Sequence, residues 1–407
     1  MATVAQTASG PCPFASGPER NDSKSAALAA QRVRIEEGAE PVRAYEQARR
    51  VLLDKTLLQG GAGADSFDAS DIDASPVFFL DGEPHRKKRG AIAHFFTPKA
   101  IDTRYHEIIE RETERLLAQL RRDGRARLDV LSFELTVAVA GNIVGLTSSD
   151  VPAMAKRLAT ILSGAFAYQL GFFGRVAFGL RRAAAMVGFY LRDVRPAVRA
   201  RRQRPQEDII SQMLERGASR KAILVECMTY AAAGMVTTRE FIVMAAWHLL
   251  ERPELLEGFL AADDKRQLAI LLEILRLEPI ASLLYRRSDP DQLSPRTKYA
   301  LDLRAVLTDE DAVGSCPHAL DPDRAERTKT HGALLSFGAG AHHCPGRHVA
   351  LHEARVFLDA MLRLPGIALE RPPDLGWSEL LMSYELRDAV VSCDRDPSPR
   401  DSSGVRP

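Results

Sequence analysis

The segment LLSFGAGAHHCPGRHVALHEARVF, residues 334–357, decides the fold of this chain through the role of Cys344. This cysteine could be a metal ligand, a catalytic nucleophile, half of a disulfide or a buried thiol. A zinc site needs about four N or S ligands in spaced pairs, but His342, His343 and Cys344 are consecutive and the chain has no CxxC pair. A cysteine nucleophile would need a base such as His94, His318 or His331, and nothing in their spacing supports one.

The glycines around Cys344 argue against an ordinary buried thiol. Gly338, Gly340 and Gly346 flank it, and glycine is costly unless the backbone is unusual or a flat object lies close to it. A helical pattern follows directly over residues 347–364, so the sulfur lies at a helix N-terminus, where free N–H groups favour a thiolate. A thiolate in a glycine-cornered loop with room for a planar ring suits a haem iron.

The composition bounds the class of protein. The 407 residues are 45% hydrophobic, and 55 Lys and Arg nearly balance 54 Asp and Glu, so charge gives no argument for a nucleic-acid partner. Five scattered cysteines favour a reducing compartment, with buried thiols expected at Cys12, Cys227, Cys316 and Cys393. We see no secretory signal and expect a cytoplasmic protein. The uncharged stretch 158–174 is interrupted by two glycines and Gln169, which predicts a buried or substrate-facing helix pair and no membrane span.

Helical patterns dominate the chain. Helices are predicted over residues 105–122, 128–146, 206–216 and 221–253, the last ended by Pro253. Residues 366–371 and 388–394 read as edge strands, and residues 42–54 are ambiguous. We therefore expect one large, mainly α-helical domain over 21–394 with small β-sheets at its margin. Disordered tails are expected over 1–20 and 395–407.

The segment FGAGAHHCPG, residues 337–346, resembles the haem-ligand loop of the cytochromes P-450, Phe-x-x-Gly-x-x-x-Cys-x-Gly. The resemblance, which spans roughly residues 40–395, implies the soluble bacterial type of that family. Its fold places haem b between a long central helix and the cysteine loop. Cys344 would be the thiolate ligand of the iron, within a haem-binding loop that includes Phe337, Gly338 and Gly346.

Two further segments match motifs of the family. Glu273 and Arg276 form a Glu-x-x-Arg pair, and Arg324 in "DPDR" is the third member of the structural cluster that the family builds there. Residues 81–101 resemble the helix that meets the haem propionates, with His85 and Arg89 on one helical face. The resemblance adds Arg286, with Arg287 as the alternative register, and His342 as propionate partners.

The long helix carries AAAGMVTT, residues 231–238, which resembles the oxygen-binding groove of the family. Ala233, Gly234, Thr237 and Thr238 match, but Val236 stands where the family has an acid that helps deliver protons. Glu240 lies one turn further on and is a candidate replacement, against the usual outcome of a solvated surface glutamate. Water chained through Thr237 is the other possibility. The catalytic candidates are thus Gly234, Thr237 and Glu240.

The resemblance implies a monooxygenase that inserts one oxygen atom from dioxygen into a mainly apolar secondary-metabolite or lipid-like molecule. Electrons would come from a ferredoxin-type or flavodoxin-type partner, docked on the basic cluster Arg86, Lys87, Lys88 and Arg347 unless that cluster is simply a solvated face. We expect a monomer whose substrate pocket includes an apolar lid over residues 162–178 and Phe78, Phe79, Ala232, Val236 and Tyr384. Because the acid is missing at 236, a peroxide-driven, coupling or dehydrating haem-thiolate enzyme is the alternative, and a haem carrier or sensor without turnover is a more distant one.

Overall fold

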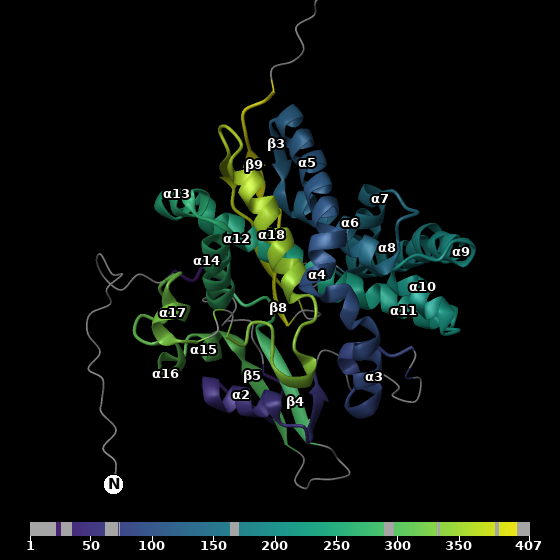
Figure 1. Ribbon diagram of the computed structural model, residues 1–407, viewed down its shortest axis with the longest axis horizontal. Helices are drawn as coiled ribbons and strands as arrows, with labels where there is room; N and C mark the ends of the chain where they lie inside the picture. Colours follow the sequence, from purple (N-terminus) through teal and green to yellow (C-terminus); the bar gives the residue numbers. More distant parts are fainter. Residues whose placement is uncertain are drawn as a thin grey trace, which may run out of the picture.

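The computed structural model describes residues 22–25, 35–61, 72, 74–162, 171–288, 297–330, 332, 334–378 and 382–396. Figure 1 shows a helical body with small sheets at its margins, as the sequence predicted. The expected N-terminal tail 1–20 and residues 397–407 of the expected C-terminal tail lie outside the described residues, as do Cys12 and His331.

The helical body is built on α5 (His106–Asp123), α6 (Leu128–Val144), α14 (Asp264–Leu277) and α18 (Arg347–Leu362). Helix α6 is apolar on nearly every side because it is buried against α5, α7 (Val151–Leu162) and α12 (Thr237–Leu250). Helix α5 buries only one stripe, which includes Ile109, Leu116 and Leu120, so its other face carries charges. The predicted helices at 105–122 and 128–146 are therefore confirmed.

The predicted long helix at 221–253 is also confirmed, with one interruption. Helix α11 (Arg220–Tyr230) continues through the π-helical segment η7 (Ala231–Val236) into α12, and Pro253 opens the next helix, α13 (Pro253–Ala261). Helix α12 packs against α6, α14 and α18 and so runs through the core. A π-helical segment within an α-helix is frequent at functional sites.

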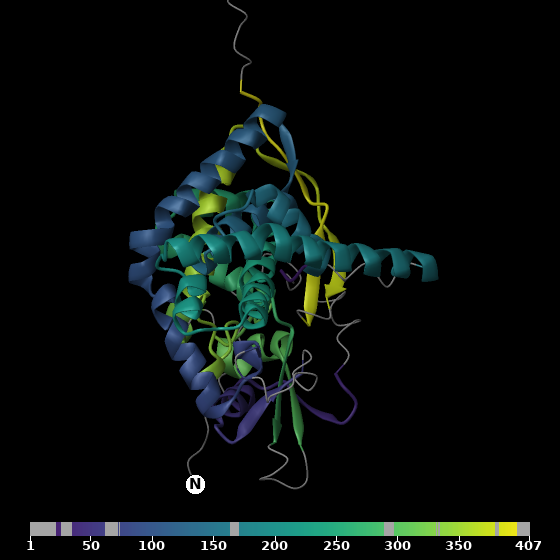
Figure 2. The ribbon, with the colours of Figure 1, turned by 90° about the vertical axis from the view of Figure 1, so that its right-hand side faces the viewer.

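The remaining helices cover one side and the lower end of the body. The stretch 158–174 covers the end of α7 and the start of α8 (Phe172–Phe189), and residues 163–170 lie outside the described residues. Helix α8 continues through η6 (Tyr190–Val194) into α9 (Arg195–Gln203), and Figure 2 shows this long helix extending at one end beyond the rest of the body. The described helices include none that is both long and apolar enough to span a bilayer. The other short helices are α2 (Tyr45–Leu53), η2 (Val77–Phe79), α3 (Gly82–Ile92), η3 (Ala93–Phe96), α4 (Pro98–Ala100), η4 (Ile101–Tyr105), α10 (Ile209–Glu215), α15 (Leu303–Leu307), α16 (Glu310–Val313), α17 (Arg324–Thr328) and η8 (Gly340–His342).

Three small sheets flank the helices. The four-stranded sheet has the order β1 (Ala39–Val42), β5 (Lys298–Asp302), β4 (Leu283–Ser288) and β2 (Leu57–Gly60). Strand β5 runs parallel to β1 and antiparallel to β4, with Tyr285 opposite Ala300. The second sheet has the order β3 (Arg125–Arg127), β9 (Val390–Ser392) and β6 (Ala368–Arg371), and the third pairs β7 (Asp374–Ser378) with β8 (Ser383–Arg387).

The structure corrects several sequence expectations at the margins. Strand β9, expected at an edge, is central because it pairs on one side with β3 and on the other with β6. The ambiguous residues 42–54 are mainly helix α2, whose buried Ala48, Val51 and Leu52 follow helical spacing. Residues 395 and 396, expected in the C-terminal tail, are among the described residues, and the backbone N–H of Asp396 donates to the Arg121 carbonyl at the end of α5 at 3.2 Å.

One of the cysteines expected to be a free buried thiol is in a disulfide. Cys227, Cys344 and Cys393 are free thiols, and Cys227 is buried as expected. Cys316, expected to be a free buried thiol, is disulfide-bonded. The spacing of the cysteines in the sequence could not predict this disulfide, because it forms only where two sulfurs lie close together in the fold.

Candidate active site

A cavity of about 380 Å³ lies between the long helix and the Cys344 loop. Its walls come from α3, from η7 and α12, from strand β4, and from the Cys344 loop with the start of α18. A volume in this range suits a small-molecule or cofactor site. Twelve of the predicted site residues line it: Phe78, His85, Arg89, Ala233, Gly234, Thr237, Arg286, Phe337, Gly338, His342, Cys344 and Gly346.

Five predicted residues do not line this cavity: Phe79, Ala232, Val236, Glu240 and Tyr384. The periodicity of the long helix explains two of them. Ala233, Gly234, Thr237, Thr238 and Phe241 line the cavity and share one face of the helix, whereas residues 232 and 236 fall on the other side. Phe79 instead packs edge-on against Phe78, and the buried Tyr384 donates its hydroxyl to the Glu278 carbonyl at 3.1 Å.

The Cys344 loop is held by backbone geometry that requires glycine. Gly340 has φ +69°, and a Cβ there would lie 2.5 Å from the Leu52 carbonyl oxygen. Gly338 has φ +68°, and the Cys344 N–H donates to the Phe337 carbonyl at 2.9 Å. These contacts fix the thiol at the cavity wall, three residues before α18 begins.

The ionisation of Cys344 differs from the sequence expectation. Burial raises the pKa of the thiol, and this outweighs the N–H groups of Gly346 and Arg347 and the positive charge of Arg89, which lower it. The helix N-terminus therefore does not by itself produce a thiolate. A bound metal cation deprotonates a coordinating thiol outright. We therefore expect Cys344 to become a thiolate when it binds a metal cation.

Cationic and hydrogen-bonding side chains gather on one part of the wall. His85 is buried and packs against the ring of His342, with their centroids 4.2 Å apart. Arg286 is buried and donates to Gln59 Oε1 at 2.5 Å, and Arg89 donates to the His343 carbonyl. Of the two registers expected from the sequence, Arg286 faces the cavity and Arg287 does not, as alternation along β4 requires.

Two observations define the electrostatics of this group. Burial, with the neighbouring charges of His342 and Arg89, lowers the pKa of His85 to about 4, so its ring is neutral near pH 7, and its Nε2 has no partner among the described residues. His342 Nε2 lies 3.0 Å from Asp81 Oδ1. Although burial raises the pKa of Asp81, the hydrogen bond with His342 and the charge of Arg286 bring it below its usual value. The sequence analysis missed Asp81 because nothing in its spacing links it to position 342.

Two residues of the expected oxygen-binding groove, Thr237 and Ala233, are joined by a hydrogen bond along the long helix. Thr237 Oγ1 donates to the Ala233 carbonyl at 2.6 Å across the π-helical segment, so its lone pairs can accept from a group in the cavity. Thr238, buried beside it, also lines the cavity. These two hydroxyls are the polar groups of an otherwise largely apolar helix face.

Glu240 is neither solvated nor available to the cavity. Its side chain is fully buried, pairs with Arg239 and Arg387, and accepts the Leu386 N–H at 2.7 Å. Strand β8 thus uses this carboxylate to attach to α12, and both sequence-based roles for Glu240 are wrong. Glu240 does lie one helical turn after position 236, as expected. Its partners on β8 are about 146 residues away in the sequence and could not be predicted from spacing.

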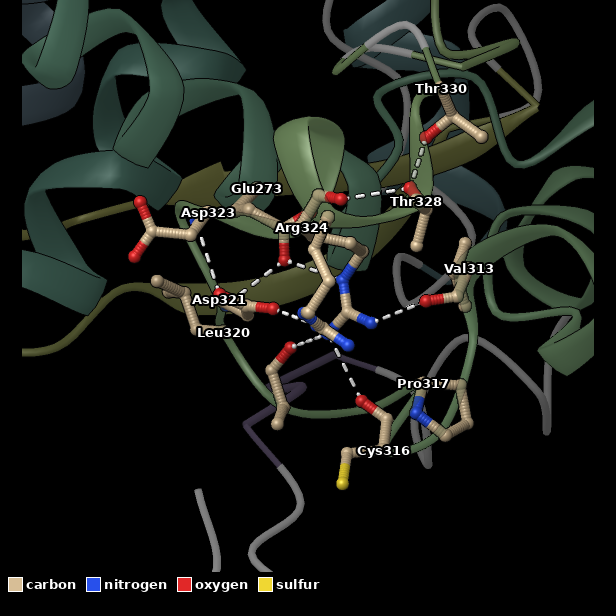
Figure 3. A network of polar contacts seen from close by, with 12 residues as sticks. Glu273, Val313, Cys316, Pro317, Leu320, Asp321, Asp323, Arg324, Thr328 and Thr330 are labelled. Carbon is tan, nitrogen blue, oxygen red and sulfur yellow. Dashed lines mark hydrogen bonds and ion pairs between the residues drawn. The ribbon is translucent and has the colours of Figure 1, made fainter. Parts of the chain in front are cut away.

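The three residues of the predicted structural cluster come together. Arg276 Nε donates to Glu273 Oε1 at 2.7 Å, and Arg324 Nε donates to Glu273 Oε2 at 3.1 Å. Arg324 also reaches the carbonyls of Val313 and Cys316, as Figure 3 shows. This network ties α14 to the segment that leads to the Cys344 loop.

A haem fits the residues that are present. A Cβ built on Gly234 or on Gly346, both of which line the cavity, would meet nothing within 4 Å, so these walls leave room for a flat ring. One thiol reaches the cavity, and the four propionate candidates border it. Within the described residues no group of three His, Cys, Asp or Glu side chains could hold an isolated metal ion.

Comparisons with known proteins agree with this geometry. The family model Cytochrome P450 matches residues 268–364. The chain is 28% identical over 366 residues to the cytochrome P450 monooxygenase PikC of Streptomyces venezuelae, covering 86% of this chain and 84% of that protein. It is 26% identical over 314 residues to the biotin biosynthesis cytochrome P450 of Bacillus subtilis, covering 74% of this chain and 76% of that one. The structure of P450BioI in complex with hexadec-9Z-enoic acid ligated acyl carrier protein superposes with a TM-score of 0.67 at 22% identity, covering 87% of this chain and 91% of that one.

The chain therefore has the fold of the cytochromes P450 and is similar to oxidoreductases of that kind. Residues 268–364 match the cytochrome P450 family, and the proteins to which the chain is similar are bacterial members of that family.

Proposed function

We propose that this chain is a haem b-dependent monooxygenase that inserts one oxygen atom from dioxygen into a mainly apolar small molecule. The observation that carries the proposal is the cavity itself. It brings the Cys344 thiol to the same space as the hydroxyls of Thr237 and Thr238, with apolar side chains around them. The apolar lining includes Val77, Phe78, Ile92, Phe96, Val139, Ile143, Phe241, Ile280, Leu284 and Val349.

When bound, the haem would supply the redox chemistry, and a cysteine thiolate ligand favours O–O bond cleavage. The residues of this chain would hold and orient it. Cys344 would bind its iron, and His85, Arg89, Arg286 and His342 would receive the two propionates through charge-assisted hydrogen bonds. Thr237 donates one hydrogen bond to the Ala233 carbonyl, and its oxygen can accept a hydrogen bond from a donor in the cavity.

The substrate is proposed as a secondary-metabolite or lipid-like molecule. The apolar lining supports this class, and the names of the relatives agree, since one belongs to biotin biosynthesis and one structural neighbour holds a fatty acid ligated to acyl carrier protein. The exposed Phe173 and Val176 of the expected lid lie at the start of α8, outside the cavity lining.

Electrons would come from a separate ferredoxin-type or flavodoxin-type protein, with the chain acting as a cytoplasmic monomer. The proposed docking cluster is smaller than the sequence suggested. Arg86 and Lys87 are exposed, but Lys88 is mostly buried, with its Nζ 2.8 Å from Glu226 Oε2 and 2.7 Å from the Ser75 carbonyl. An acidic partner would thus meet Arg86 and Lys87 first.

The test is the carbon monoxide difference spectrum of the reduced haem protein. The wild type should show the red-shifted Soret band of thiolate ligation, and Cys344→Ser should bind haem without that band. Equal spectra in the two proteins would refute the ligand assignment.

A peroxide-driven reaction is the second candidate, because Val236 lies off the cavity face and Glu240 is paired elsewhere. Turnover with dioxygen, a surrogate ferredoxin and its reductase should be compared with turnover on hydrogen peroxide alone. Product with peroxide only would replace the monooxygenase proposal. A haem protein with neither NADPH consumption nor any ligand-induced spin shift would instead be a carrier or sensor.

A further inference from the structure

The disulfide at Cys316 points to a partner that the count of cysteines identifies. Cys316 is disulfide-bonded, whereas Cys227, Cys344 and Cys393 are free thiols. The sequence contains five cysteines, so Cys12 is the one that remains. Because a disulfide within one chain needs two of its sulfurs, elimination assigns Cys12 as the partner of Cys316.

The described part of the N-terminal segment, residues 22–25, lies beside the loop that contains Cys316. The backbone N–H of Asp22 donates to the His318 carbonyl at 3.1 Å, and Asp22 Oδ2 accepts the Leu320 N–H at 2.9 Å. Cys12 precedes Asp22 by ten residues, and a chain of that length spans up to about 35 Å. Because His318 is two residues from Cys316, position 12 is within reach of the Cys316 sulfur.

The anchoring of residues 22–25 does not depend on the disulfide. Ser23 Oγ donates to Glu278 Oε1 at 3.0 Å, and the fully buried Ser25 donates its hydroxyl to the other oxygen of this carboxylate. Asp22 also forms an ion pair with Arg252. These contacts hold the N-terminal segment next to the Cys316 loop, so a disulfide here joins two parts of the chain that the fold already brings together.

The loop at residues 316–319 also holds both arginines of the Glu273 network. The Cys316 carbonyl accepts from Arg324 at 3.0 Å, as Figure 3 shows, and the Pro317 carbonyl accepts from Arg276 at 2.7 Å. Cys316 has φ +63°, a left-handed conformation that residues other than glycine rarely adopt and that persists where surrounding contacts fix it. A bond to the Cys316 sulfur therefore acts on the backbone that carries the network.

We propose that Cys12 and Cys316 form a redox-modification site, in which oxidation fastens the N-terminal segment to the loop of the Glu273 network. The oxidant is a hydroperoxide. It oxidises one thiol to a sulfenic acid, and the second thiol displaces water from that sulfur as the S–S bond forms. With hydrogen peroxide, two thiols give one disulfide and two water molecules. A dithiol reductant reverses the reaction by thiol–disulfide exchange.

The site is independent of the proposed monooxygenase reaction, and its effect should appear as stability. Cys12 and Cys316 are about 300 residues apart in the sequence, and cross-links that close long loops restrict the unfolded chain most. In a reducing compartment, disulfides of this kind are usually transient and redox-sensing. We therefore expect the oxidised protein to unfold about 3 °C or more above the reduced protein.

The first experiment maps the bond in the haem-loaded protein after treatment with hydrogen peroxide and alkylation of the free thiols. Trypsin cleaves after Arg20, Arg304 and Arg324, so one peptide ends at Arg20 and carries Cys12, and peptide 305–324 carries Cys316. Mass spectrometry should find the two peptides linked, and separate after dithiothreitol. Peptide 305–324 alkylated at its cysteine or linked to a different one overturns the proposal, as does a disulfide-linked dimer in non-reducing electrophoresis.

The second experiment measures thermal unfolding of the peroxide-treated protein with and without dithiothreitol. The reductant should lower the midpoint of the wild type by about 3 °C or more and leave that of Cys12→Ser unchanged. Cys12→Ser removes one sulfur of the pair and leaves the loop 316–319 intact. Cys393→Ser, which removes a free thiol, is the matched control and should respond as the wild type does. Linked peptides with an equal response of the wild type and Cys12→Ser would overturn the fastening role.

Discussion

Two buried polar regions of this molecule follow opposite rules. In the network around Glu273, part of which Figure 3 shows, Glu273 is bonded to Arg276 and Arg324, and both arginines donate in addition to backbone carbonyls. At the cavity wall, His85 Nε2, Tyr230 Oη, Ser336 Oγ and Glu353 Oε1 are buried without a partner among the described residues.

The two regions differ because the network around Glu273 stabilises the fold, whereas the cavity wall is available to a ligand or a reaction. A buried ion pair contributes to a defined fold only when its remaining donors and acceptors are satisfied, as they are around Glu273. Buried groups left unsatisfied around one cavity cost stability, and proteins keep such groups where a ligand or a reaction uses them. The comparison therefore predicts large stability effects in the network and small ones, with functional consequences, at the cavity wall.

The largest effect on stability is expected for Glu273→Gln. This change removes the carboxylate between Arg276 and Arg324, which are 0% and 2% exposed, and leaves two buried guanidinium groups without their charge partner. Breaking such a cluster costs about 3–5 kcal/mol. Denaturant unfolding of the haem-loaded protein measures it, and a loss below about 1 kcal/mol would contradict the assigned role of the network.

The next effect is a pH dependence caused by Glu353. Burial raises its pKa to about 8 in the folded protein, above the ordinary value of 4.5, so between these values the folded state binds a proton that the unfolded state has lost. Stability must then fall as the pH rises through this window, by at most about 1.4 kcal/mol per pH unit. The unfolding free energy of the wild type should therefore fall relative to Glu353→Gln between pH 5 and pH 8. Parallel curves for the two proteins would show that Glu353 is ionised in the fold.

A smaller effect is expected for Thr237→Val, which keeps the shape of the side chain. The lost hydrogen bond to the Ala233 carbonyl is worth about 1 kcal/mol. Because the same hydroxyl faces the cavity, the fraction of NADPH electrons recovered as hydrogen peroxide should also rise. Unfolding and peroxide assays on one preparation separate the two effects, and a stability loss with unchanged peroxide would assign Thr237 a purely structural role.

The smallest effect is expected for Ser336→Ala. Its hydroxyl is buried at the cavity wall without a partner, so its removal breaks no hydrogen bond in the protein and should change the unfolding free energy by less than about 1 kcal/mol. Thermal unfolding alongside Glu273→Gln gives the direct contrast. A loss as large as that of Glu273→Gln would remove the distinction between the two regions.

The sequence predicted the elements whose signals are local. Helical periodicity identified α5, α6 and the long helix, and the spacing of Phe337, Gly340, Cys344 and Gly346 identified the loop and its resemblance to the cytochromes P450. Most short strands were not predicted, because strands of three to six residues have little periodicity and are stabilised by partners distant in the chain.

By itself, then, the sequence determined which residues could share a helical face and which loop could present a thiol, since both depend on spacing and backbone freedom. Only the tertiary structure decided how each polar group is used. It paired Glu240 with β8, placed Val236 away from the cavity and bonded His342 to Asp81. It also placed Glu353 at the cavity wall, with Oε1 lacking a hydrogen-bond partner among the described residues. The physical reason is that burial and charge partners set the protonation state of a side chain, and those partners come from elements far away in the sequence.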